Sequence, residues 1–180
     1  MDMVRSLDEQ ALSLLQQQPP TGLPPQAIGI AVDMLGELAR QLGSLRYFVL
    51  RDRAGGWGVF EWSEVAPQES ALQPGTWLAA YSHREAATAL QVRANTRNAP
   101  SQQIHADALE VVELEVLRIL WLGLALGKAE GLLFCDRLQT PLPTRERDSR
   151  PSIQLTALRC RDLKQQLAMA LRRQSPPPVA

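Results

Sequence analysis

Two short apolar runs, Thr76 to Tyr81 and Gly131 to Cys135, constrain the fold more than any other feature of the sequence. Apolar runs of this length are typical of strands that are covered on both faces of a sheet. The first run leads directly into Ser82-His83-Arg84-Glu85, which has the spacing of a capping box and predicts a helix over about residues 84–93. Buried strands that join helices in this way predict an α/β (α+β) fold.

Two helices are expected ahead of the first strand. Ser6 and Glu9 have capping-box spacing, and the apolar residues after them recur at helical intervals as far as the glutamines and prolines of 16–20. Pro24-Pro25 then leads into a second helix with a continuous apolar stripe. Gly43 is placed to end this helix in a left-handed cap.

An antiparallel hairpin is predicted next. Leu45 to Arg51 and Trp57 to Trp62 are rich in aromatic and β-branched residues, and turn-forming residues separate them at 52–56. Apolar side chains point to both faces of these strands, and a sheet can bury only those that face its helices. We therefore expect an exposed apolar edge that contacts a second copy or another protein, with the candidate residues Tyr47, Trp57 and Trp62.

The second half of the chain leaves one assignment open. Residues 109–114 fit both an alternating strand and the start of a long helix, and we expect a helix that ends near Gly127, with room for a short strand before it. Arg137 to Arg150 is predicted to form a long loop. Ser152 is predicted to cap a last helix carrying Leu155, Leu158, Leu163, Leu167 and Leu171. The whole is a small mixed sheet of about four to five strands, flanked by helices.

The composition fits a single domain over residues 1–174, followed by a Pro-rich tail at 175–180 that is expected to be disordered. With 180 residues, 45% of them apolar, the chain can bury a substantial core. Basic and acidic residues both number 19, so no net charge draws the protein to nucleic acid. The two cysteines are too few for a disulfide framework, and no signal peptide or transmembrane segment is predicted. These features favour a cytoplasmic protein.

The charges are unevenly distributed along the chain. Residues 137–173 hold nine basic and three acidic residues, a net charge of +6, and the rest of the chain carries −6. A basic segment of this kind is commonly a solvated helix face, but it also fits contact with an acidic partner surface. The loop arginines that we expect in such a contact are Arg145, Arg147 and Arg150.

Few residues offer catalytic chemistry. Cys135 ends one predicted strand, and His83 follows the other. If the two strands were parallel, both residues would emerge at one edge, Cys135 as a nucleophile and His83 as its base. The sequence supplies neither an oxyanion hole nor a third orienting group, and a first-turn histidine and a buried thiol are the simpler interpretations. We therefore predict no catalytic, cofactor-binding or metal-binding residues, and a protein that is not an enzyme.

The middle of the chain resembles the N-terminal domain of the SseB family of small bacterial α/β proteins. The resemblance is carried by Gly75-Thr76-Trp77-Leu78-Ala79-Ala80-Tyr81-Ser82, by Glu85-Ala86-Ala87 and by Gly131-Leu132-Leu133-Phe134-Cys135-Asp136. Cys135-Asp136 stands where that family usually has an Asn-Pro pair. The resemblance implies a mixed sheet flanked by helices, without established catalytic residues, that acts as an interaction module.

We thus expect a non-enzymatic interaction or adaptor domain, with a regulatory or assembly role through a protein partner or a homodimer. The last apolar strand and its Leu-rich helix are also similar to the end of a GAF-type domain. The alternative is therefore a GAF-like small-molecule sensor, or a chaperone-like binder, with an apolar pocket between sheet and helices.

Overall fold

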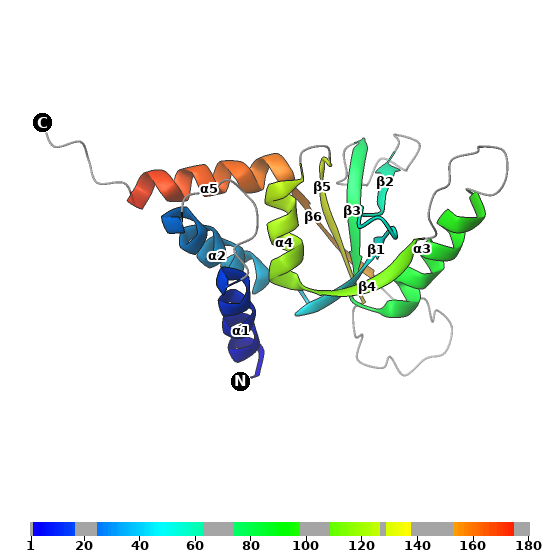
Figure 1. The fold of residues 1–180 in the computed structure, drawn as a ribbon, viewed down its shortest axis with the longest axis horizontal. Helices are drawn as coiled ribbons and strands as arrows, with labels where there is room; N and C mark the ends of the chain where they lie inside the picture. Colours follow the sequence, from blue (N-terminus) through cyan, green and yellow to red (C-terminus); the bar gives the residue numbers. More distant parts are fainter. Residues whose placement is uncertain are drawn as a thin grey trace, which may run out of the picture.

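The computed structural model describes residues 2–16, 25–62, 74–97, 109–126, 129–137 and 153–174 of the chain. Within these residues the chain forms five helices and an open mixed sheet of six strands (Figure 1). The elements in chain order are α1 (Asp2–Gln16), α2 (Pro25–Ala39), β1 (Arg46–Arg51), β2 (Val59–Trp62), β3 (Gly75–Tyr81), α3 (Arg84–Arg97), β4 (Glu110–Glu115), α4 (Val116–Ala125), β5 (Gly131–Arg137), β6 (Ile153–Arg159) and α5 (Cys160–Gln174).

The two apolar runs form the adjacent central strands β3 and β5, as predicted, and the α/β class is confirmed. These two strands are parallel, and Tyr81 lies beside Cys135, whereas the other pairings among the described strands are antiparallel. The strand order is β4-β1-β3-β5-β6, and β2 lies beside the first half of β3. β4 and β6 therefore lie at the two ends of this order, in a sheet that has one strand more than the four to five expected.

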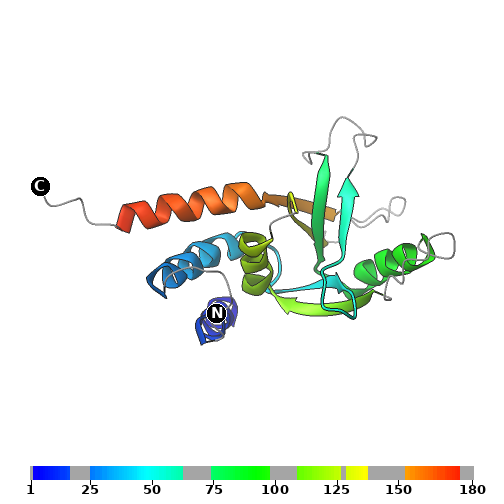
Figure 2. The same cartoon turned by 45° about the horizontal axis from the view of Figure 1, so that its top comes forward.

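Helices cover the two faces of the sheet unequally. α1, α2, α4 and α5 lie together on one side, which we call the helical face, and α3 lies on the other side against β1, β3 and β4, which we call the α3 face (Figure 1). α5 continues from the end of β6 and reaches away from the sheet (Figure 2). Side chains alternate along each strand, so the main core receives every second residue, among them Tyr47, Val49, Leu78, Leu132 and Phe134.

Close packing of α4 depends on a glycine. A Cβ atom on Gly123 would lie 2.8 Å from Leu132 Cδ1 of β5 and 2.9 Å from Leu163 Cδ1 of α5. These distances are shorter than van der Waals contact, so any side chain at this position would have to displace both leucines. The helix is buried on most of its sides, and Gly123 lies inside its regular part, so the glycine serves close packing.

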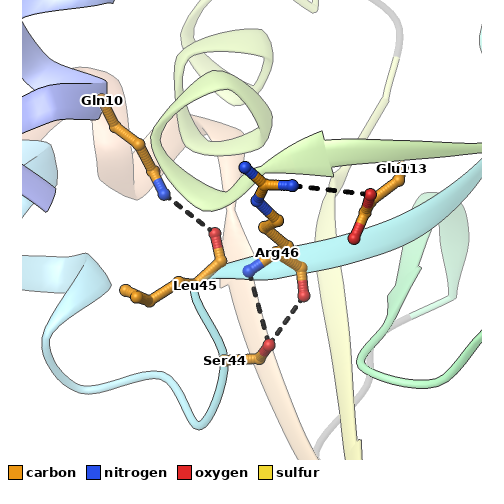
Figure 3. Close-up of polar contacts among 5 residues, drawn as sticks. All are labelled: Gln10, Ser44, Leu45, Arg46 and Glu113. Atoms are coloured by element: carbon orange, nitrogen blue, oxygen red, sulfur yellow. Dashed lines mark hydrogen bonds and ion pairs between the residues drawn. The ribbon is translucent and has the colours of Figure 1, made fainter. Parts of the chain in front are cut away.

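Gln10 ties α1 to the rest of the core. Its side-chain nitrogen donates a hydrogen bond of 3.1 Å to the carbonyl oxygen of Leu45 (Figure 3), and its side-chain oxygen accepts one of 3.4 Å from the Leu117 N–H. Leu117 lies in the first turn of α4, where Glu115 makes no side-chain cap. Gln10 therefore satisfies a backbone donor that would otherwise lack a partner at this helix end.

The predicted hairpin forms at its turn, but its pairing is wrong beyond the first residues. Its turn forms, and the Gly56 N–H donates to Asp52 Oδ1 at 2.7 Å, but β1 and β2 share only one isolated bridge, between Arg51 and Trp57. Beyond the bridge β2 pairs with the first half of β3, while β1 pairs with β4 and with the far end of β3. Turn residues fix the turn alone, and β3 is long enough to pair with both strands along one edge.

The predicted helix that begins at Ser152 is also wrong over its first part. Residues 153–159 form β6, which pairs with β5 along its whole length, and α5 begins only at Cys160. Leu155 and Leu158 are three residues apart, a spacing typical of a helix, but in β6 they lie on opposite faces of the sheet. In residues 109–126 both alternatives hold in part, because the strand β4 leads directly into the helix α4.

Gly43 does not form the predicted left-handed cap. α2 ends at Ala39, and the described glycines with positive φ are Gly55 and Gly75. Gly43 lies instead against the carboxylate of Asp136, where an added Cβ atom would be 3.0 Å from Cγ. The predicted loop at 137–150 and the tail at 175–180 lie outside the described residues, apart from Arg137. No helix in the described ranges is long and apolar enough to cross a membrane.

Candidate functional site

The C-terminal ends of the parallel strands β3 and β5 bring His83 and Cys135 to one edge of the sheet. The Ser82 N–H donates to the carbonyl oxygen of Cys135 at 3.1 Å, and the Ser82 hydroxyl donates to the same oxygen at 3.3 Å. Nδ1 of His83 lies 3.0 Å from the Ser82 hydroxyl oxygen. Ser82 therefore holds the start of α3 against the end of β5.

A cleft of about 330 Å³ opens at this edge, on the α3 face. The strand register sets Tyr81, Cys135 and Leu155 side by side across β3, β5 and β6. The first turns of α3 stand over this row. The lining residues are Tyr81, Ser82, His83, Glu85, Ala86, Cys135, Ile153 and Leu155. The volume lies at the lower end of the range for small-molecule pockets, and the cleft is mainly apolar.

The thiol in the cleft is unsuited to nucleophilic chemistry at neutral pH. Burial, with a smaller contribution from the Asp136 carboxylate, raises the pKa of Cys135 to about 12. Burial, again the main cause, also raises the pKa of Tyr81 to about 12. A nucleophilic cysteine needs the opposite shift, because the thiolate is the reactive form. Across the described ranges no three acidic, histidine or cysteine side chains gather as metal ligands. The cleft can therefore bind apolar groups, and its Cys135 thiol is not an activated nucleophile.

The outer edge of β6 borders the cleft. Cys135 directs its backbone carbonyl to Ser82 on the β3 side, so the backbone groups of its neighbours along β5 point to β6. Their partners Gln154 and Thr156 take up these hydrogen bonds. The alternate residues 153, 155 and 157 consequently direct their N–H and C=O groups to the outer edge. In the described part of the chain, β6 pairs with β5 alone.

The side chains along this edge are apolar and exposed. Ile153 is 60% exposed and Leu155 is 55% exposed, both on the α3 face beside the cleft, and β6 carries no charge before Arg159 at its end. Sheet edges in soluble proteins are commonly protected by charges, proline or bulges. The first half of β6 has none of these protections, which makes it suited to pair with another strand.

The opposite edge of the sheet has a different character. β4 carries a glutamate at three of its six positions, Glu110, Glu113 and Glu115. Glu113 lies 3.7 Å from the guanidinium group of Arg46 in β1 (Figure 3). Charges of one sign along an edge strand oppose its association with another strand. β4 and β6 therefore differ in their capacity for pairing, and β6 is the one whose first half carries no charge.

Of the predicted interaction residues, the structure describes the side chains of Tyr47 and Trp57. Tyr47 is fully buried in the core rather than exposed, since its ring packs edge-on against Phe134 with centroids 5.0 Å apart. Trp57 is partly buried against the core, and the Arg51 guanidinium carbon lies 5.4 Å from its ring centre. The Trp62 side chain lies outside the described residues, as do the loop arginines Arg145, Arg147 and Arg150.

The residues that do form an exposed apolar edge, Ile153 and Leu155, were assigned to a helix from the sequence. A signal for the strand was present. Ile153-Gln154-Leu155-Thr156 alternates apolar and polar residues and is rich in β-branched side chains.

No model of a known protein family matches the sequence, and no curated protein matches it significantly.

Proposed function

We propose that this chain is a protein-interaction domain that binds an extended segment of a partner along the outer edge of β6. The observation that carries the proposal is the exposed, uncharged first half of β6, which borders an apolar cleft. A segment added to a sheet edge gains affinity from backbone hydrogen bonds and specificity from pockets for its alternate side chains. The resemblance to SseB-like domains, which implies an interaction module, agrees with this proposal.

The cleft gives such a segment a place for a side chain. Side chains of an added strand stand beside those of β6 on the same face, and neighbouring strands lie about 4.8 Å apart. A large apolar residue opposite Leu155 would therefore lie at the mouth of the cleft. Covering Leu155 and Ile153 would stabilise the complex by about 1–3 kcal/mol, because each is already partly buried.

The proposal is tested by selecting binders from a displayed library of random ten-residue peptides. We expect the wild-type protein to enrich peptides with apolar residues at alternate positions, and Leu155→Lys to lose them. Val92→Lys is the matched control, because Val92 on α3 is 56% exposed and Leu155 is 55% exposed. Enrichment that survives Leu155→Lys, or no enrichment by the wild-type protein, would contradict the proposal.

A second candidate function is the binding of a small apolar molecule in the cleft, as expected of a sensor. The observation that favours it is the position of the cleft at the C-terminal ends of parallel strands, where α/β proteins commonly bind ligands. Ala86→Phe separates the two candidates. Filling the cleft from α3 should abolish the binding of a small molecule, but it should only weaken a peptide that is held mainly by the backbone of β6.

A further inference from the structure

The side chains along the outer edge of β6 change from apolar to basic along the strand. The residues whose side chains lie on the α3 face are, in order, Ile153, Leu155, Ala157 and Arg159. Two large apolar side chains thus stand at the beginning of the strand, a small one follows, and a guanidinium group stands at the end. The same four positions alternate with residues that bond to β5, so their backbone groups point to the outer edge.

The charge at the end of the strand lacks a facing acid within β6 and β5. Gly131 of β5 lies opposite Arg159, and Trp77 of β3 lies opposite Gly131 on its other side. A Cβ atom on Gly131 would lie 2.6 Å from Cζ3 of Trp77, so the indole ring covers this glycine. The row beside Arg159 therefore offers a glycine and an aromatic ring, and the neighbouring acid, Glu130 just before β5, has its side chain beside Gly75 at the start of β3.

From this order we infer that the partner segment carries a carboxylate opposite Arg159 and that it runs antiparallel to β6, the slightly more stable of the two pairings, so that large apolar residues follow at the fourth and sixth positions after the carboxylate. The inference rests on the proposed function and names the partner's chemistry: an extended acidic-apolar peptide. Directly opposed residues of antiparallel strands interact, and pairs of opposite charge stabilise the pairing. Successive residues of the partner on this face are two apart, so Arg159, Ala157, Leu155 and Ile153 face its positions 1, 3, 5 and 7.

Acidic partners also suit the surroundings of this end of β6. Residues 153–174 contain Arg159, Arg161, Lys164, Arg172 and Arg173 as basic residues and Asp162 as the acidic one. Arg161 is exposed at the start of α5 and lies 3.5 Å from Asp162. An acidic N-terminal end of the partner segment is therefore attracted to this end of the strand, whereas its apolar end meets the uncharged half.

The test uses three fluorescent peptides with the full-length protein and measures affinity by anisotropy. The first peptide reads Glu-Thr-Val-Thr-Leu-Thr-Val, the second has Gln in place of Glu, and the third is the first in reversed order. We expect the first to bind about two- to fivefold more tightly than the second at low salt, and this difference to shrink as salt is added. The reversed peptide should bind more weakly than the first.

Arg159→Gln should remove the difference between the Glu and Gln peptides, whereas Arg53→Gln, at an exposed arginine of the turn between β1 and β2, should preserve it. Equal affinities of the Glu and Gln peptides for the wild-type protein would overturn the inference and leave the proposed function standing. Tighter binding of the reversed peptide would overturn the antiparallel direction. A failure of all three peptides, together with a library selection that enriches nothing, would overturn the proposed function itself.

Discussion

The hydroxyl group of Tyr47 lies 2.9 and 3.0 Å from the two carboxylate oxygens of Asp136 and donates to them inside the core. Asp136 is the residue after Cys135 of the cleft, and its side chain points to the helical face instead. The Gly43 N–H also donates to this carboxylate, at 3.4 Å. The buried acid therefore joins β1, β5 and the turn that follows α2. It fixes the end of β5 that forms the cleft.

Tyr47→Phe should lower the free energy of unfolding by about 1–3 kcal/mol, because it leaves a buried carboxylate without its main donor. Chemical denaturation followed by circular dichroism measures the change. Tyr81→Phe is the control, since Tyr81 is only partly buried and lines the cleft, and it should cost less. An equal effect of the two substitutions would show that the Tyr47 hydroxyl is not a principal donor to Asp136.

Two glycines in helices should respond in opposite ways to alanine. Gly123→Ala should destabilise the protein by about 1–3 kcal/mol, because its methyl group would meet Leu132 and Leu163. Gly36→Ala in α2 should stabilise it by about 0.5–1 kcal/mol, because alanine favours a helix more than glycine does and no atom outside the adjacent backbone lies within 4 Å of the added Cβ. Thermal unfolding of both variants checks the sign of each effect. Stabilisation by Gly123→Ala would contradict the close packing of α4.

The thiols should react slowly in the folded protein. Burial raises the pKa of both cysteines, that of Cys135 to about 12 from 9. At pH 8 a shift of this size lowers the thiolate fraction of Cys135 about a thousandfold, and its reaction with a thiol reagent should slow accordingly. Denaturant should restore the ordinary rate at both sites. Rapid reaction of Cys135 in the folded state would instead support a nucleophilic role beside His83.

The same shift predicts how stability depends on pH. The folded-state pKa of Cys135 lies above the unfolded value, so its contribution to stability is complete below about pH 9 and is lost as the pH rises to about 12. Tyr47 acts in the same direction above about pH 10, because burial and the Asp136 carboxylate raise its pKa. Unfolding free energies measured from pH 8 to 11 should fall. Stability that is constant over this range would contradict both shifts.

The sequence predicted the central strands because their signal is local. Thr76 to Tyr81 and Gly131 to Cys135 are apolar over the length of a buried strand, and a cap follows the first. β6 was missed because Leu155 and Leu158, read alone, fit a helix, and only pairing with β5 selects the strand. The partner of β2 was missed for the same reason, since local turn residues do not specify a distant strand.

The cleft could be predicted only in part. The positions of His83 and Cys135 at strand ends are visible in the sequence. Their meeting at one edge depends on parallel pairing of the two strands, and β3 and β5 are parallel. Leu155 and Ile153 join the cleft through the antiparallel register of β6, which no local pattern specifies. The chemistry of the cleft depends on burial, which raises the Cys135 pKa, and burial is a property of the folded chain.

Pairing of a partner strand with β6 can be followed by amide hydrogen exchange of the protein with and without a selected peptide. We expect the outward-pointing N–H groups of Leu155 and Ala157 to exchange more slowly when the peptide is bound. The inward-pointing N–H groups of Thr156 and Leu158, already bonded to β5, should change little. Protection confined to α3 and the cleft, or found along β4, with unchanged exchange at Leu155 and Ala157, would contradict this pairing.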